Sequence, residues 1–399
     1  MSRITGYARS LSLGVPFNAF SRDIWLICIS NAIGALGEGM YFWVFPLYIK
    51  SLQADYVQLG AVFSALYGAS ALVLIPGGLL ADRFDRKKIL ILSWIPWGLS
   101  PLIYSFAQSW QQLIPGAICW GISMLGLPAL NAYIISSVTD KGKLASVLSF
   151  VWSSYSFSYI FAPTIGAFLA EITGIRWVLR LSALLCGVAT CVFLLLHSQN
   201  PRKNSKTSRE IKMSSDRERQ VWRQVLTWAG FFTATTFFLT VGRTFVQTFL
   251  SENIGLSEFH IGLYGSIGYA GTTFIGIAVG RLGDKWRKTG AFSLCLVFHF
   301  LSIAPLLLIR EPTVLMTSAF LFGGAIVTGS LVSSFVGTVA PENKRGLWVS
   351  VPQTLSLLAS FAAPFLGGYL YSQSPTYAFA FSIMPVPFLI LFALAALKE

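Results

Sequence analysis

Glu38 is the only acidic residue that lies deep inside a long apolar stretch of this sequence. If residues 34–41 are helical, Asn31 and Tyr41 lie on roughly the same face as Glu38. A carboxylate in apolar surroundings is costly, and such residues usually face an interior cavity and have a function there. A single buried carboxylate can take up and release a proton. The alternative is a structural carboxylate, hydrogen-bonded within a helix bundle or placed nearer the outer mouth.

Arg243 carries the opposite charge in another apolar stretch. Parts of the sequence repeat at an offset near 202, and at that offset Arg243 matches Tyr41, one helical turn from Glu38. We expect Arg243 either to pair with Glu38 or to bind an anionic group of a ligand. A structural ion pair is the alternative interpretation. Arg180, near the start of its own apolar stretch, is predicted to extend its charge toward water instead.

Neutral polar side chains in the apolar stretches can supply further hydrogen-bonding groups to a cavity. None carries much weight alone, because Ser and Thr also bond to the carbonyl groups of their own helix. His299 stands alone in its stretch and is interpreted as a packing histidine, with a proton relay as the alternative. The candidates for the cavity are Asn131, Ser153, Ser154, Tyr155, Ser158, Gln247, Gln353 and Thr354.

Helices that cross a membrane must position these residues. The chain is 54% hydrophobic and 11% charged, whereas average proteins have about 25% charged residues. There is therefore too little polar surface to cover a water-soluble globule. At about 20 apolar residues per crossing, the sequence predicts an all-α membrane protein with twelve transmembrane helices. Their expected positions are 24–49, 57–80, 89–107, 112–137, 146–170, 176–197, 224–250, 259–280, 290–309, 314–339, 347–371 and 376–397.

The basic residues are distributed unevenly between the two sides of the predicted membrane. With the N-terminus inside, 24 of the 29 Lys and Arg residues fall in cytoplasmic segments, as the positive-inside rule requires. Both termini are therefore expected in the cytoplasm of a multi-pass protein of the cell membrane. We predict a cytoplasmic segment at 1–22 without a cleavable signal, six-helix bundles at 23–197 and 224–399, and a polar cytoplasmic linker at 198–223.

Other classes of function lack their sequence signals. The basic residues lie in short loops and not on one amphipathic face, which argues against nucleic acid as a partner. No Gly-x-x-x-x-Gly-Lys-Ser/Thr loop occurs, so nothing indicates ATP hydrolysis. The five cysteines all lie in apolar stretches, and the three histidines are scattered. We therefore predict that the chain is not an enzyme and has no metal site and no cofactor.

A dense cluster of charge separates the second and third predicted helices. Residues 82–88 hold six charges in seven positions. A weaker copy follows at 280–288, and other landmarks repeat at nearly the same offset. Such self-similarity indicates two related halves. The matched residues are Gly60 and Gly262, Gly78 and Gly280, Asp82 and Asp284, Arg83 and Lys285, Pro163 and Pro364, and Gly166 and Gly367.

The run Gly-x-Leu-Ala-Asp-Arg-x-x-Arg-Lys at 78–87, with its copy and the twelve predicted spans, resembles the major facilitator superfamily over essentially the whole chain. The resemblance implies a secondary carrier whose two bundles rock around a central substrate cavity in alternating access. It also implies that the first and seventh helices face each other across that cavity. Glu38 and Arg243 are then brought to the same site.

The resemblance further implies a role for the charged motif, which in this family is thought to latch the cytoplasmic side. We carry that role to Gly78, Asp82, Arg83 and Arg86, with Gly280, Asp284 and Lys285 as the weaker copy. Gly78 has no Cβ atom, so a neighbouring helix can approach closely there. A charge cluster that only fixes the topology is the alternative.

The Ala-Pro-x-x-Gly segments at 162–166 and 363–367 allow two interpretations. The first resembles the antiporter signature of proton-driven drug exporters in the superfamily, although the glycines usual before the proline and the arginine expected in the fourth helix are missing. Because the segment occurs in both halves, Pro163, Gly166, Pro364 and Gly367 are equally explained by helix bending and packing.

The sequence favours a proton-coupled exporter of hydrophobic or amphipathic small molecules that works as a monomer in the lipid bilayer. Glu38, the 15% aromatic content and the scarcity of strong polar groups in the spans support this prediction. One alternative is a symporter or facilitator that takes up a small organic anion through Arg243. A sensor without transport activity, built on a carrier fold, is the third.

Overall fold

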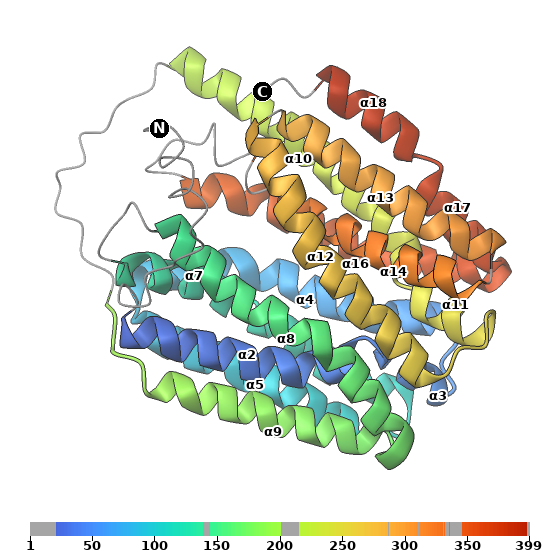
Figure 1. The fold of residues 1–399 in the computed structure, drawn as a ribbon. Coiled ribbons are helices and arrows are strands. Elements are labelled where there is room, and N and C mark those ends of the chain that lie inside the picture. Colours follow the sequence, from blue (N-terminus) through green and yellow to red (C-terminus); the bar gives the residue numbers. More distant parts are fainter. Residues whose placement is uncertain are drawn as a thin grey trace, which may run out of the picture.

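The computed structural model describes residues 21–138, 144–200, 215–285, 287–309, 311–329, 331, 335 and 345–396, and within them every regular element is a helix. The helices gather in two bundles, one from each half of the chain (Figure 1). Nine helical stretches of these residues are long and apolar enough to cross a bilayer, in agreement with the predicted all-α membrane fold. The predictions for residues 1–20, for linker residues 201–214 and for most of 330–344 lie outside the described residues.

The first bundle follows the first six apolar stretches of the sequence. Two of these stretches break, the first at Trp43 and Val44 and the fourth at Met124 and Leu125. Pro46 lies in the first turn of the helix after the first break, a position that proline suits better than a helix interior. The helices are α2 (Arg22–Phe42), α3 (Phe45–Ser51), α4 (Tyr56–Arg83), α5 (Arg86–Phe106), the 3₁₀-helix η2 (Trp110–Leu113), α6 (Ile114–Ser123), α7 (Gly126–Ser137), α8 (Leu144–Thr173) and α9 (Ile175–Leu194).

The second bundle repeats this arrangement. Its first helix begins at Ser215, inside the stretch expected as linker, and breaks at Thr244 and Phe245, close to the position that matches the break at Trp43. The last apolar stretch breaks at Met384 and Pro385. The helices are α10 (Ser215–Arg243), α11 (Val246–Glu252), α12 (Glu258–Lys285), α13 (Lys288–Leu308), α14 (Pro312–Ile326), α16 (Arg345–Gln373), α17 (Pro375–Ile383) and α18 (Val386–Ala396).

Large apolar side chains cover the outside of both bundles. Leu72 and Phe388 expose about three quarters of their surface, at 75% and 74%, and Phe157, Trp177 and Leu391 are also exposed. Soluble proteins rarely expose apolar patches of this extent. A lipid environment accounts for them.

The two bundles are joined most tightly at one end, called here the closed end, where α3 and α11 lie. Helix α4 crosses α16 there, and α8 crosses α12. Gly60 of α4 packs against the backbone carbonyl of Pro364, and Gly262 of α12 packs against that of Pro163. The two crossings are the same contact made twice, once in each direction, and small residues permit such close approach of helices in membranes.

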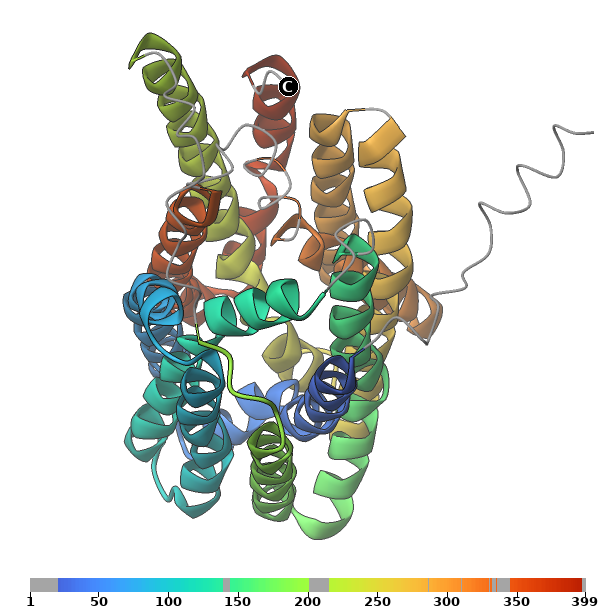
Figure 2. The ribbon, with the colours of Figure 1, turned by 90° about the vertical axis from the view of Figure 1, so that its left-hand side faces the viewer.

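At the opposite end, called the linker end, the bundles diverge. This end carries residues 82–88 and the start and end of the linker. Figure 2 looks onto it and shows the first bundle, in blue to green, below the second bundle, in yellow to red. Helix α10 starts well away from α7 in both views (Figures 1 and 2).

Polar side chains also connect the bundles at the closed end. Lys50 Nζ lies 3.8 Å from Glu252 Oε1, and the hydroxyl of Tyr56 donates a 2.7 Å hydrogen bond to Glu252 Oε2. The carboxylate of Glu171 accepts a 2.8 Å hydrogen bond from the backbone N–H of Phe259, in the first turn of α12. These contacts can exist only while this end is closed.

Candidate functional site

Glu38 of α2 is buried inside the first bundle, with 3% of its surface exposed. Its two carboxylate oxygens each accept one hydrogen bond. Trp120 of α6 donates from Nε1 to Oε1 at 2.8 Å, and the hydroxyl of Tyr155 of α8 donates to Oε2 at 2.7 Å. Three helices therefore meet at this one carboxylate.

Two glycines beside Glu38 explain why its surroundings are so tight. A Cβ atom at Gly39 would lie 2.6 Å from the Cβ of Ala162 in α8, and one at Gly37 would lie 3.0 Å from the backbone oxygen of Ser182 in α9. Helix α2 therefore packs closely on both neighbours. The side chain between the two glycines is held within protein.

Glu38 has only neutral partners among the described residues. No Lys, Arg or His nitrogen of that part of the chain lies within 4.0 Å of its carboxylate. In particular, Arg243 does not pair with it. The ionised carboxylate is thus stabilised by two hydrogen bonds but by no cation. The protonated carboxyl group is neutral and needs no cation.

Asn31 and Tyr41, expected on the face of Glu38, are buried but do not bond to it. The amide nitrogen of Asn31 and the hydroxyl of Tyr41 have no hydrogen-bond partner in the part of the chain that the structure describes. Tyr41 packs edge-on against Tyr104, with ring centroids 6.0 Å apart. Sequence reasoning instead missed Trp120, although a buried indole N–H usually finds a hydrogen-bond partner.

Arg243 ends α10 and lines a cavity just beneath the closed end. The cavity offers about 70 Å³ to the centres of water-sized molecules, and one water needs about 10–15 Å³ by this measure. The guanidinium carbon of Arg243 lies 5.9 Å from the ring centroid of Phe322. The lining residues are Phe42, Trp43, Pro46, Phe63, Tyr67, Thr240, Arg243, Thr244, Gln247, Tyr269, Phe322 and Ile326.

Both bundles contribute to this cavity, and several of its polar atoms are unpaired. Gln247 of α11 exposes 9% of its surface and its Oε1 has no hydrogen-bond partner. The indole nitrogen of Trp43 is likewise buried without a partner. The cavity thus combines aromatic walls with hydrogen-bonding groups that no atom of the described residues satisfies.

Tyrosines connect the Glu38 site with this cavity. The hydroxyls of Tyr155 and Tyr159 lie 3.4 Å apart, and the rings of Tyr159 and Tyr269 have centroids 4.6 Å apart. Tyr269 belongs to α12 and lines the cavity. A change at Glu38 can therefore reach the second bundle through three side chains in contact.

The remaining predicted cavity residues lie elsewhere. Asn131 of α7 and Gln353 of α16 are half-buried and do not line this cavity. His299 is completely buried in the second bundle, where its Nε2 lies 2.8 Å from the hydroxyl of Ser382. None of these three residues lines the cavity beside Arg243.

In the charged motif at 82–88, the contacts with neighbouring elements are made by residues that follow Asp82 and Arg83. Asp82 and Arg83 are exposed. Arg86 donates to the backbone oxygen of Ala132 at 3.1 Å and to Gln199 Oε1 at 2.9 Å. The motif thereby holds the last turns of α7 and the chain that follows α9.

Asp85, between α4 and α5, fixes the same segment. It accepts hydrogen bonds from the backbone N–H groups of Lys87 and Gln199, both at 3.0 Å, and from the hydroxyl of Ser198. Burial raises the pKa of Asp85, but the hydrogen bonds from Ser198, Gln199 and Lys87 outweigh it and hold the pKa below its usual value. The ionised form is therefore part of the folded structure.

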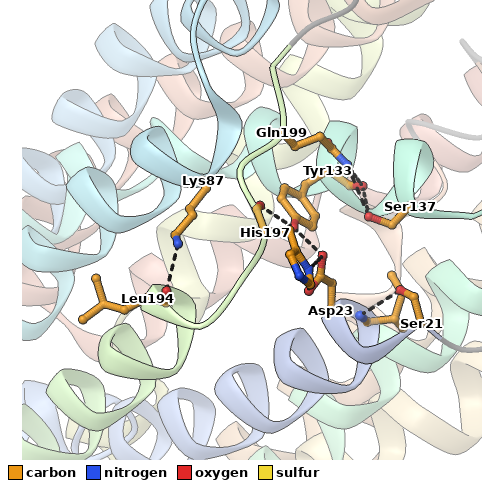
Figure 3. A network of polar contacts seen from close by, with 9 residues as sticks. Ser21, Asp23, Lys87, Tyr133, Ser137, Leu194, His197 and Gln199 are labelled. Carbon is orange, nitrogen blue, oxygen red and sulfur yellow. Dashed lines mark hydrogen bonds and ion pairs between the residues drawn. The ribbon is translucent and has the colours of Figure 1, made fainter.

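Figure 3 shows the rest of this anchor at the linker end. His197 lies with Nδ1 3.0 Å from Asp23 Oδ1. The hydroxyl oxygen of Tyr133 lies 2.8 Å from Asp23 Oδ2 and 2.8 Å from the backbone oxygen of His197, so its one hydrogen is shared between two acceptors. Lys87 donates to the backbone oxygen of Leu194 at 2.8 Å. The chain leaving α9 is thus held in place before the linker begins.

The glycines of the motif and of its copy face open space. A Cβ atom would meet nothing within 4 Å at Gly78 or at Gly280. The close approach predicted at Gly78 occurs instead at Gly77, which packs against the backbone of Leu125. The backbones of Asp284 and Lys285 end α12, and their side chains lie outside the described residues.

The Pro-x-x-Gly segments pack against the first helix of their own bundle. Gly166 lies against the backbone of Met40, and a Cβ atom at Gly367 would lie 2.5 Å from the backbone oxygen of Val241. The carbonyls of Pro163 and Pro364 face the opposite bundle, as described above. Each segment therefore touches both bundles close to a helix break.

Comparisons with known proteins agree with this architecture. The family model of the Major Facilitator Superfamily matches residues 27–247 and 236–398. The chain is 25% identical over 371 residues to Multidrug resistance protein 2 of Bacillus subtilis (strain 168), covering 90% of this chain and 92% of that protein. It is 22% identical to the class B tetracycline resistance protein of Escherichia coli, covering 87% and 88%.

Solved structures show the same fold at low identity. The nucleoside transporter NupG superposes with a TM-score of 0.73 at 14% identity, covering 94% of this chain and 98% of that one. A bacterial homologue of the human lysosomal transporter Spinster, in an inward-facing and unoccupied conformation, gives 0.71 at 15% identity, covering 93% and 96%. With its two bundles of helices and its family match along nearly the whole length, the chain belongs to the major facilitator superfamily and is a multi-pass membrane transporter of small molecules.

Proposed function

We propose that this transporter is a monomeric, proton-coupled exporter of amphipathic small molecules, with Glu38 as the residue that carries the proton. The observation that carries the proposal is the environment of Glu38, which is buried, bound by two neutral donors and connected by tyrosines to the cavity between the bundles. A carboxylate without a cation can change its charge without breaking an ion pair.

Protonation of Glu38 changes what its two partners must do. The ionised carboxylate accepts from both Trp120 and Tyr155. A protonated carboxyl has a hydrogen to donate, and the indole N–H cannot accept it, whereas a tyrosine hydroxyl can both donate and accept. The hydroxyl of Tyr155 must therefore turn, and its neighbour Tyr159 contacts Tyr269 of the second bundle. This is the route by which proton uptake acts on the arrangement of the bundles.

In this proposal the linker end faces the cytoplasm. The basic residues of 83–88 and of the linker favour that orientation through the positive-inside rule. The contacts of the closed end then seal the outer side, and the cavity receives substrate from the cytoplasm. Export follows when the crossings at Gly60 and Gly262 separate and the linker end closes.

The relatives favour export over uptake. Two proteins that match about nine tenths of the chain are described as multidrug and tetracycline resistance proteins. The aromatic walls of the cavity suit planar, partly apolar molecules.

Proton flux in proteoliposomes tests the proposal. Wild type, Glu38→Gln and the control Glu311→Gln, whose carboxylate is exposed at the start of α14, would be compared under an imposed pH gradient with a mixed panel of lipophilic cations, amphiphiles and organic acids. We expect compound-dependent proton movement in wild type and control but not in Glu38→Gln. Equal compound movement in all three without proton flux would make Glu38 structural and the protein a facilitator.

A second candidate is proton-coupled uptake of a small organic anion. Arg243 favours it, because this cation lines the cavity and has no carboxylate within 4.0 Å in the described part of the chain. The direction of proton movement separates the two candidates. Protons move against the compound in export and with it in uptake.

A further inference from the structure

We infer that the cavity beneath the closed end selects substrates that carry a negatively charged group, such as a carboxylate, on a planar aromatic body. The inference rests on the proposed function and adds the substrate class. It goes beyond the names of the multidrug and tetracycline resistance proteins reported above, which do not state the charge of the compound.

Charge is the first reason. Arg243 is the only charged residue among those that line the cavity. Its guanidinium makes neither an ion pair nor a hydrogen bond with the described residues, and Phe322 covers one side of it. A guanidinium offers five N–H donors in a planar fork that fits a carboxylate with two parallel bonds. The described part of the chain supplies no such anion, and a substrate can.

The neutral polar groups of the cavity point to the same chemistry. The indole N–H of Trp43 can only donate, and it is buried without an acceptor. Among the described residues that line the cavity, the one buried acceptor without a partner is Oε1 of Gln247. A carboxylate beside an N–H or O–H group would satisfy all three, with its oxygens on Arg243 and Trp43 and its neighbouring donor on Gln247.

The walls select the body of the substrate. Phe42, Phe63, Tyr67 and Tyr269 contribute rings from three helices, and Trp43 stacks on Tyr264 with centroids 6.2 Å apart. Rings arranged in this way offer faces and edges to a flat aromatic molecule. An extended polar molecule such as a sugar would leave its hydroxyls unpaired against them.

A cationic substrate finds no counter-charge in this cavity. Glu38 is covered by Trp120 and Tyr155 and is not among the lining residues. Arg243 would repel a cation across a space with little water. The inference therefore predicts that the charge of a compound, at constant shape, decides whether it binds.

Three probes of one shape isolate that charge: 2-naphthoate, neutral 2-naphthamide and cationic 2-naphthylmethylammonium. Their dissociation constants would be measured by calorimetry with the full-length protein in lipid nanodiscs. We expect wild type to bind 2-naphthoate at least about tenfold more tightly than 2-naphthamide, since a charge-assisted bidentate contact is worth that much. The ammonium compound should bind most weakly.

The variants assign the preference to a residue. Arg243→Gln should bind 2-naphthoate and 2-naphthamide equally, and Arg243→Lys should keep part of the preference because it keeps the charge but not the fork. Arg180→Gln is the matched control. Arg180 also lies over an aromatic ring, 4.9 Å from that of Trp177, but on α9 at the outside of the first bundle, so the preference should survive.

The outcomes are distinguishable. Wild type that binds 2-naphthoate no better than 2-naphthamide, or not at all, overturns the inference, as does an Arg243→Gln variant that keeps the preference. Should Arg243→Gln fail to fold, an unchanged preference in Arg243→Lys would count against the bidentate contact. Glu38→Gln separates this result from the proposed function, because it should keep 2-naphthoate binding and lose only proton flux.

Discussion

Gly262 packs against the carbonyl group of Pro163 so closely that a Cβ atom would lie 2.5 Å from the carbonyl oxygen. This contact, with its counterpart between Gly60 and Pro364, joins the bundles at the closed end. The contact is made by backbone and not by long side chains, so it tolerates no added volume. A substitution at either glycine should therefore shift the protein from the conformation in which this end is closed toward the one in which it is open.

Gly262→Ala should weaken the closed end. The added methyl group must displace backbone, and overpacking of this kind costs about 1–3 kcal/mol. Cysteine labelling at the closed end should therefore increase in the variant, and transport should fall several-fold. Gly230→Ala is the control, because a Cβ atom there meets nothing within 4 Å. Equal labelling in the two variants would show that the crossing does not hold this end shut.

Tyr155→Phe should impair proton coupling without removing Glu38. The variant loses the hydroxyl that donates to Glu38 Oε2 and touches Tyr159, so the proposed route to the second bundle is interrupted. We expect compound-driven proton flux in proteoliposomes to fall by about tenfold, the size of one hydrogen bond to a charged group. Tyr369→Phe, at an exposed position, is the control and should behave as wild type. Unchanged proton flux in Tyr155→Phe would show that the Tyr155 hydroxyl has no part in proton coupling.

Asp85 should make the stability of the linker end depend on pH. Its pKa is held below the usual value in the folded protein, so its contribution is present above the pKa of the unfolded chain, about 3.9, and is lost as the pH falls through the folded pKa. At pH 7, Asp85→Asn should be less stable than wild type by about 1–3 kcal/mol. In thermal unfolding the difference should shrink below pH 4.

Asp82→Asn provides the comparison for that measurement. Asp82 is exposed and has no ion pair within 4.0 Å in the described part of the chain, so its replacement should change the unfolding midpoint little. A difference between Asp85→Asn and wild type that stays constant from pH 7 to pH 3 would mean that the ionised form of Asp85 is not what matters.

Membrane potential should accelerate export of an aromatic anion. When an anion leaves as a proton enters, positive charge moves inward twice, so an inside-negative potential drives both movements. With 2-naphthoate in proteoliposomes, a potassium gradient with valinomycin should raise the rate of exchange. Electroneutral transport, unaffected by the potential, would instead match uptake of anion and proton together.

The sequence was sufficient for the fold because its signals are local. Apolar length places the helices, and the pairing of Gly60 with Gly262 and of Pro163 with Pro364 correctly indicated two related halves. The breaks at Trp43 and Phe245 were not predicted, because each lies inside a stretch that was expected to form one continuous helix. Pro46 lies close to the first break, but a proline in a helix can also produce a bend without ending the helix.

The site was predictable only in part, since side-chain partners depend on how helices rotate about their axes. Glu38 and Arg243 could be identified from the sequence because they are charged residues in apolar stretches. Nothing in the sequence showed that the two side chains do not pair. Trp120 could not be assigned to Glu38 without knowing which face of α6 meets α2. In the same way, one residue of rotation decides that Gly77, and not Gly78, meets α7.

The paired crossings of the closed end also have a meaning for the origin of the chain. Gly60 meets Pro364 while Gly262 meets Pro163, so each half offers the same two surfaces and receives the same two in return. That reciprocity defines an isologous interface, the kind formed by two identical subunits about a two-fold axis. The closed end thus has the contact pattern of a homodimer interface, although both of its sides belong to one polypeptide.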